Sequence, residues 1–242
     1  MAFNPQSTLN IAQNGIKIAL FGESGIGKTW QISTLRRPFI ISTEGGLLTL
    51  ARSGRDIPYV EVRTVEELRE ARIALDSDEY FDTYDTIVID SVSELADLHM
   101  MRIKGEGRAK GWDTYTQTQD VVNEELRNFF SLATEGKDIV MIFKLGRVED
   151  KNTGRVAYSP FINSSNFSTK IPYLFNEVLA IRAQKTTDKE GNPYIDRWIQ
   201  CANDGSWACK DQSGYLADEE YADLGYIIDK IRNKGEETDA EE

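Results

Sequence analysis

The sequence predicts an α/β fold, in which a mostly parallel, twisted sheet is flanked by helices and antiparallel hairpins lie towards the C-terminal end. Three observations lead to this prediction. Short apolar runs alternate with helical patterns over the first two thirds of the 242 residues, which is typical of parallel strands joined by crossovers. A glycine-rich loop separates the first apolar run from the segment that follows it. The last third has turn signals at 190–192 and 203–205, which indicate hairpins.

Eight segments have the composition of strands, since they are rich in apolar, β-branched and aromatic residues. They are residues 16–21, 38–42, 59–62, 86–90, 138–143, 176–183, 194–201 and 206–210.

Three longer segments, at 64–75, 91–103 and 119–133, have patterns that predict helices. The first opens with Thr64 and Glu67, which have the spacing of a capping box. Residues 29–35 can begin a further helix directly after the glycine-rich loop.

Composition limits the classes of protein to consider. The net charge is −12, so the chain is not a uniformly basic nucleic-acid coat, and any polyanion must bind to local patches. Two cysteines, Cys201 and Cys209, give no disulfide framework and indicate reduced thiols. A single histidine, His99, excludes zinc sites built on histidine. No signal peptide or apolar run long enough to cross a membrane is present, so we expect a soluble cytoplasmic protein without a membrane partner.

The length suits one large domain. We expect an N-terminal arm at residues 1–14, a folded core at 15–234 and an acidic, disordered tail at 235–242.

The glycine-rich loop carries the first functional motif. Residues 22–29 complete the pattern G-x-x-x-x-G-K-[ST] of a P-loop, which wraps phosphates with backbone N–H groups at the start of a helix. Lys28 is expected to reach the β- and γ-phosphates of ATP, and Thr29 to ligate Mg²⁺. The nucleotide-binding residues predicted from this motif are Gly22, Glu23, Ser24, Gly25, Ile26, Gly27, Lys28, Thr29 and Trp30.

Two carboxylates follow predicted strands. Asp90 ends the strand 86–90 and is expected to hold the Mg²⁺ water shell beside Thr29. Glu44 follows the strand 38–42, where it would face the γ-phosphate and orient the attacking water. The alternative for Glu44 is an ordinary carboxylate at the N-terminus of a short helix.

The order of these motifs resembles the RecA superfamily of recombinases and ring helicases. The strand that ends in Thr-Glu-Gly at 43–45, the strand that ends in Asp-Ser at 90–91, and the segments 139–147 and 206–214 carry the resemblance, which spans residues 16 to 214. It implies a RecA-like P-loop NTPase core that binds ATP and Mg²⁺. It also implies the catalytic residues: Lys28, Glu44 as the base, Lys144 as the sensor of the γ-phosphate, and Lys210 as a cation that reaches a neighbouring subunit's nucleotide.

Two positions depart from that family. Lys144 stands where Gln or His is usual, and Gln212 stands where a second basic residue is usual. Gln212 is neutral, so slow hydrolysis is expected. In size the chain resembles the phage-type minimal RecA-like proteins, the Sak-four group of single-strand annealing recombinases, which would place it in the host cytoplasm.

Two basic segments, 102–119 and 144–170, stand where RecA-like proteins carry their DNA-binding loops. Both interleave basic and aromatic residues, which suits single-stranded DNA because charge follows phosphates and rings stack on bases. The alternative is a solvated loop with a β-hairpin. The residues expected to contact nucleic acid are Arg108, Lys110, Arg147, Lys151 and Arg155.

Three functions remain open from the sequence. One is an ATP-dependent recombination enzyme that assembles as a ring or filament on single-stranded DNA, with a single-strand-binding protein as a candidate partner. The second is a nucleotide-switched annealing module with little turnover, which Lys144 and Gln212 favour. The third is another P-loop enzyme, such as a small-molecule kinase or a helicase- or motor-type ATPase.

Overall fold

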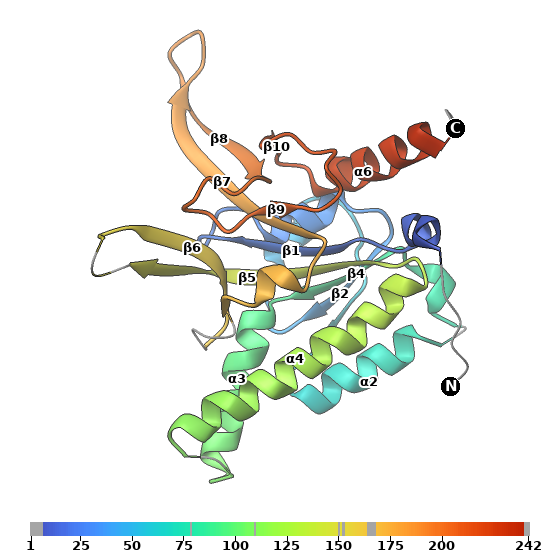
Figure 1. The fold of residues 1–242 in the computed structure, drawn as a ribbon, viewed down its shortest axis with the longest axis vertical. Coiled ribbons are helices and arrows are strands. Elements are labelled where there is room, and N and C mark those ends of the chain that lie inside the picture. Colours follow the sequence, from blue (N-terminus) through green and yellow to red (C-terminus); the bar gives the residue numbers. More distant parts are fainter. Residues whose placement is uncertain are drawn as a thin grey trace.

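The fold was analysed in a computed structural model that describes residues 7–77, 79–108, 110–149, 151, 153–163 and 168–239. Within these ranges one sheet contains ten strands (Figure 1). They are β1 (Lys17–Gly22), β2 (Pro38–Ser42), β3 (Tyr59–Glu61), β4 (Thr86–Asp90), β5 (Asp138–Glu149), β6 (Val156–Phe161), β7 (Glu177–Thr187), β8 (Pro193–Gln200), β9 (Lys210–Asp211) and β10 (Glu219–Tyr221).

The strand order is β10-β8-β7-β1-β5-β4-β2-β3, with β6 paired to β5 and β9 paired to β7. Strands β7, β1, β5, β4, β2 and β3 are parallel, whereas β6, β8 and β9 pair antiparallel with their neighbours. The predicted α/β class is therefore confirmed, including the antiparallel hairpins of the last third. Parallel pairing also brings the ends of β1, β2 and β4 to one edge of the sheet.

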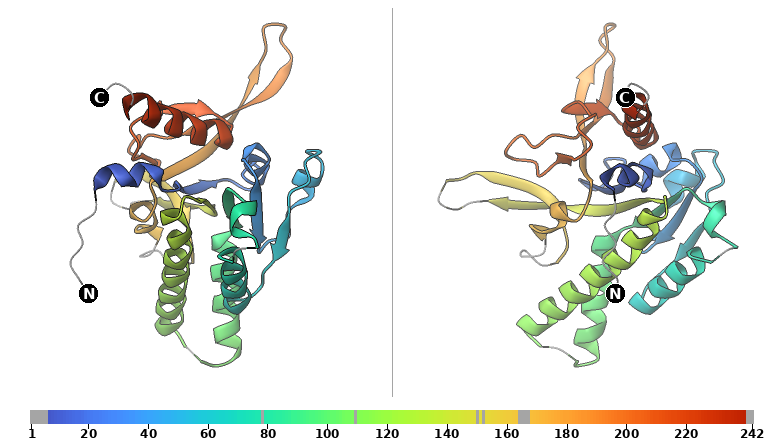
Figure 2. Two further views of the ribbon diagram at one scale, coloured as in Figure 1. Left: turned by 90° about the vertical axis from the view of Figure 1, so that its right-hand side faces the viewer. Right: turned by 45° about the vertical axis from the view of Figure 1, so that its right-hand side comes forward.

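Helices cover both faces of this sheet (Figures 1 and 2). The helices are α1 (Leu48–Ala51), α2 (Val65–Leu75), α3 (Val92–Gly105), α4 (Trp112–Thr134) and α6 (Leu224–Asp239), with 3-10 turns η1 (Thr8–Gln13), η2 (Thr29–Thr34), η3 (Phe81–Thr83) and η4 (Ile171–Tyr173). Helices α2, α3 and α4 pack on one face, and η2, α1 and α6 on the other.

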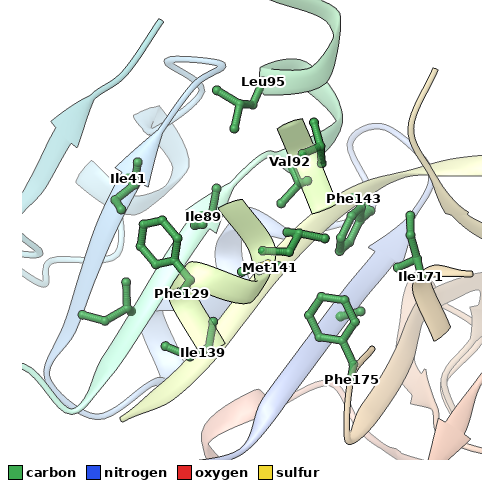
Figure 3. Packing of buried hydrophobic residues seen from close by; sticks show 14 of the residues in the cluster. Ile41, Ile89, Val92, Leu95, Phe129, Ile139, Met141, Phe143, Ile171 and Phe175 are labelled. Atoms are coloured by element: carbon green, nitrogen blue, oxygen red, sulfur yellow. The ribbon is translucent and has the colours of Figure 1, made fainter. Parts of the chain in front are cut away.

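Alternation along the central strands builds the two halves of the core. In β1, Ala19 and Phe21 point to the face covered by α2, α3 and α4, while Ile18 and Leu20 point to the opposite face. Residues of β5 alternate in the same way, and Phe129 of α4 belongs to the same buried cluster as Ile139 and Met141 of β5 (Figure 3). A strand with apolar residues on both faces is buried on both sides, which is what a helix-covered parallel sheet requires.

Side-chain caps fix where two helices begin. Thr64 Oγ1 accepts a 3.2 Å hydrogen bond from Glu67 N, and the Glu67 carboxylate accepts one from Thr64 N, so the predicted capping box is confirmed. Ser91 Oγ accepts from Glu94 N at 3.2 Å and starts α3 immediately after β4.

Several elements differ in extent from their predictions. Strand β5 continues to Glu149 because its outer half pairs with β6, which has no buried apolar run to reveal it. Helix α4 begins at Trp112 rather than at residue 119, since its early turns pack beside α3 with Thr114 and Thr118 buried. Of the predicted strand 206–210 only Lys210 lies in β9, which is Lys210–Asp211, while Trp207 makes a single bridge to Tyr158.

Two helical segments also differ from what the sequence predicted. Residues 29–34 form a 3-10 helix, in keeping with their β-branched and hydroxyl side chains, which are poor α-helix formers. Helix α6 was not predicted, and it continues to Asp239, inside the segment expected as an acidic tail, whose disorder stays a prediction. Residues 1–6 of the predicted arm and 240–242 lie outside the described residues.

Candidate nucleotide-binding site

The phosphate loop lies at the end of β1, where the chain turns into η2. Gly25 and Gly27 have φ of +73° and +115°, in the region that side chains with a Cβ rarely adopt. At Gly22 the constraint is space, because a Cβ there would lie 2.8 Å from the carbonyl oxygen of Ile181. The glycines of the motif are therefore required by the backbone itself.

A cavity of about 650 Å³ opens above this loop. Eight of the nine predicted nucleotide-binding residues line it; the exception is Ile26, whose side chain packs against the core. Trp30 is 44% exposed and lines the same cavity. The other lining residues are Glu44, Gly46, Thr49, Asp90, Ser91, Lys144 and Leu145. This volume falls in the range of small-molecule and cofactor sites.

Lys28 lies across the mouth of the loop. Its Nζ donates to the carbonyl oxygens of Gly22 at 2.9 Å and Glu23 at 2.7 Å. Burial lowers the pKa of Lys28, and the negative charges of Asp90 and Glu44 act in the opposite direction. The side chain thus lines the cavity, with its ammonium held by two carbonyl oxygens at the start of the loop.

Thr29 and Asp90 meet although β5 lies between β1, which leads into the phosphate loop, and β4, which ends at Asp90. Thr29 Oγ1 donates to Asp90 Oδ2 at 2.8 Å, and Asp90 is only 5% exposed. Burial raises the pKa of Asp90 to about 6. In the described part of the chain, no group of three or more His, Cys, Asp or Glu residues could hold a metal ion. A hydroxyl and a carboxylate are ligands that fit Mg²⁺, which takes few protein ligands and keeps phosphate and water oxygens.

Glu44 is fixed by the first residue after β4. Ser91 Oγ donates to Glu44 Oε1 at 2.6 Å, and the backbone of Ser91 pairs twice with Thr43 Oγ1. Helix α1 has Leu47 as its N-cap and no acidic residue in its first turn, so Glu44 is not a helix-terminal carboxylate. The alternative interpretation of Glu44 is therefore excluded by its position, and its role as the base stays a prediction.

Lys144 lines the cavity, but its ammonium is paired with α3. Nζ donates to Glu94 Oε2 at 2.6 Å and to Asp97 Oδ2 at 3.1 Å. Burial opposes the charge, yet these two carboxylates leave the pKa of Lys144 raised. Sequence reasoning missed both partners; they stand three residues apart at the start of a helix, on one face, which is the signal that could have pointed to them.

Lys210 and Gln212 lie away from the phosphate loop of their own chain. Lys210 pairs with Val178 of β7, which is itself opposite Ala19, about 10 Å along β1 from Gly22. Lys210 Nζ donates to the carbonyl oxygens of Phe175 at 2.5 Å and Pro172 at 3.3 Å, before the start of β7. Gln212 Oε1 accepts from Asn176 at 3.2 Å.

The five predicted nucleic-acid residues fall on two separate projections. Arg108, which pairs with Glu106 at 2.8 Å, and Lys110 lie at the α3–α4 tip. Arg147, Lys151 and Arg155 lie on the β5–β6 hairpin. Figure 1 shows the hairpin to the left and the helical tip at the foot of the view.

Some of these basic side chains are partly engaged within the chain. Arg147 pairs with Glu149 at 3.2 Å, and Arg155 donates to Gly205 O at 2.5 Å. Exposed ion pairs of this kind contribute about 0 to 1 kcal/mol, so a polyanion can displace them. The DNA role of all five residues stays a prediction.

Comparison with known proteins agrees with this geometry. Residues 14–213 match the family model of the AAA domain, which names no recombinase group. A search of curated proteins found no match. Among the described residues, no helix is long and apolar enough to cross a membrane. A domain of the AAA type typically binds ATP with Mg²⁺, which suits the loop, Thr29 and Asp90. Because the match covers most of its length, the chain belongs to the AAA domain family and is a P-loop ATPase domain of that type.

Proposed function

We propose that the protein is an ATP-hydrolysing DNA recombination protein that binds and anneals single-stranded DNA as an oligomer. The observation that carries the proposal is the course of β5. This strand lies beside β1 at the phosphate loop, where Lys144 pairs with Gly22, and then continues into a projecting basic hairpin. One strand therefore joins the nucleotide cavity to Arg147 and, across the turn, to Arg155.

The β5–β6 hairpin is anchored to β7 and to the segment before β9. A shift of β5 would therefore be transmitted to these neighbouring segments. Tyr158 of β6 stacks on Trp207 with ring centroids 4.5 Å apart, and Arg182 of β7 lies 4.6 Å above the same indole. Tyr158 N donates to Ser206 O at 2.7 Å. Basic side chains on such an arm suit the phosphates of a single strand.

The position of Lys210 supports the proposed assembly. Since this side chain lies two strands from β1 and points to carbonyl oxygens before β7, it does not reach the loop of its own chain. A head-to-tail oligomer would bring this edge of one subunit to the nucleotide of the next, and such heterologous contacts build rings or filaments.

A second function is favoured by two contacts. Lys144 is neutralised by Glu94 and Asp97, and Gln212 carries no charge. With few cations near the γ-phosphate, the protein would act as a nucleotide-switched DNA-binding module with little turnover. A helicase- or motor-type ATPase would use the same loop without annealing.

One experiment separates these functions. Annealing of two complementary labelled oligonucleotides is followed without nucleotide, with ATP and with a non-hydrolysable analogue, and ATP hydrolysis is measured with and without single-stranded DNA. The proposal expects nucleotide-dependent annealing and DNA-stimulated hydrolysis. Annealing that depends on nucleotide while DNA leaves the rate of ATP hydrolysis unchanged supports the nucleotide-switched module. Hydrolysis without DNA binding or annealing contradicts the proposal.

A further inference from the structure

The β7–β8 hairpin backs the outer side of the phosphate loop. A Cβ at Gly22 would meet the backbone and side chain of Ile181 on β7. A Cβ at Gly27 would lie 3.7 Å from Ile181 Cδ1 and 3.8 Å from Arg197 Nε. The hairpin therefore touches the loop at its beginning and at its middle.

Arg197, on β8, makes a single polar contact with that loop. Its Nε donates to the carbonyl oxygen of Ile26 at 3.1 Å, across 171 residues of sequence. In a trans peptide the carbonyl oxygen and the following N–H point in opposite directions. Holding the Ile26 oxygen outward thus turns the N–H of Gly27 inward. Gly27 lines the nucleotide cavity and Arg197 does not, as this arrangement requires.

The guanidinium of Arg197 is not paired with a carboxylate of the described residues. Among the described residues it forms no ion pair, whereas Arg147 on the neighbouring hairpin pairs with Glu149. A cation on the carbonyl oxygen polarises the peptide group, which makes the N–H at the other end a stronger donor. That N–H belongs to the part of the motif that cradles the α- and β-phosphates.

We infer that Arg197 is a positioning residue that orients and polarises the Ile26–Gly27 peptide for the phosphates of the bound nucleotide. It acts through the loop and touches neither the base nor the ribose. The inference requires only that the loop binds a nucleotide, and it is independent of the proposal on DNA.

Two ligands test this role: ATP and inorganic tripolyphosphate, which has no base or ribose. Their dissociation constants are measured with Mg²⁺ for the parent, Arg197→Ala, Arg197→Lys and Arg197→Gln. Lys185→Ala, which removes an exposed positive charge from β7 of the same hairpin, is the control. Thermal melting of each variant reports folding.

Arg197→Ala should weaken the binding of ATP and of tripolyphosphate by the same factor. We expect a factor of about 5 to 10 for the loss of a charged hydrogen bond at an exposed position. Arg197→Lys should restore most of the affinity and Arg197→Gln part of it, with Lys185→Ala within about twofold of the parent. If Arg197→Ala unfolds, the Lys and Gln variants carry the test, and equal affinity in the parent and Arg197→Gln contradicts a role for charge. A lower affinity for ATP with an unchanged affinity for tripolyphosphate would overturn the inference. A folded Arg197→Ala protein with the affinities of the parent would overturn it as well.

Discussion

The hydroxyl of Thr29 donates a 2.8 Å hydrogen bond to Asp90, which joins the end of the phosphate loop to the end of β4 across the intervening strand β5. Thr29 and Asp90 are the residues that would hold Mg²⁺, and the ion would supply positive charge beside the phosphates of a bound nucleotide.

Asp90→Ala should remove the effect of Mg²⁺ on nucleotide affinity. The parent is expected to bind ATP more weakly when Mg²⁺ is removed with EDTA, whereas the variant should bind about 10- to 100-fold more weakly with Mg²⁺ and respond little to EDTA. Titration of a fluorescent ATP analogue measures both. An Asp90→Ala protein that still gains full affinity from Mg²⁺ would show that another residue holds the metal.

Glu44→Gln should preserve ATP binding and slow hydrolysis by about 10²- to 10⁴-fold, because the amide fills the same space beside Ser91 but accepts no proton. Glu219→Gln, which makes the same change at an exposed position of β10 outside the cavity, is the control. Single-turnover hydrolysis separates this step from product release. Equal rates for the parent and Glu44→Gln would assign the base to another group.

DNA binding by the β5–β6 hairpin should depend on salt. Replacing Arg147, Lys151 and Arg155 together by Ala should weaken single-stranded DNA binding and reduce the slope of log K against log salt by about two, at roughly 0.7 for each phosphate that the protein no longer neutralises. Fluorescence anisotropy measures this slope between about 50 and 200 mM salt, a range in which phosphate contacts change the affinity strongly.

The control for that variant removes three exposed charges elsewhere: Arg63→Ala, Lys185→Ala and Lys189→Ala. Both triple variants change the net charge equally, so only a local groove distinguishes them. Equal slopes in the two variants would argue against the hairpin as the DNA site.

The stability of the fold should decrease as the pH rises, because of the buried carboxyl of Glu177. This residue pairs with Asp211 on the neighbouring strand β9. Glu177 is 1% exposed, and burial, together with the negative charge of Asp211, raises its pKa to about 8. A carboxyl whose pKa is raised by folding stabilises the protein fully below its unfolded value and loses that contribution as pH rises to the folded value. The loss is at most about 1.4 kcal/mol per pH unit between roughly pH 5 and 8.

Glu177→Gln should therefore show a flatter dependence of melting temperature on pH over this window. The amide stays neutral, so it contributes the same at both ends of the range. Melting curves of the parent and the variant at pH 5, 6, 7 and 8 give the comparison. Parallel curves for the two proteins would mean that Glu177 is already ionised at neutral pH.

The sequence predicted the parts of the site that are encoded locally. The loop glycines, Thr29, Glu44 and Asp90 stand at the ends of apolar strands, and parallel pairing brings such ends together. Helix starts at Thr64 and Ser91 were likewise visible in short patterns.

What the sequence did not predict depends on contacts between distant segments. Lys144 meets Glu94 and Asp97 only because β5 lies beside the start of α3, and Arg197 reaches Ile26 only because β8 folds back over the loop. Strand β6 was not among the eight predicted strands, although a β-hairpin was the alternative for its segment, since its partner is the exposed half of β5, where no buried pattern marks it. Periodicity records burial within an element and carries little information on which elements meet.

The most direct test of the proposal that subunits share a nucleotide site is a mixing experiment with two variants that are each expected to be inactive. Lys28→Ala removes the phosphate-loop cation but keeps Lys210, and Lys210→Ala keeps the loop but removes the cation that would reach the next subunit. The ATPase rate is measured with single-stranded DNA for each variant alone and for a 1:1 mixture. Since a head-to-tail interface takes its loop from one subunit and Lys210 from the next, random mixing should restore about a quarter of the parent rate. A mixture no more active than the two variants measured separately would contradict a site shared between subunits.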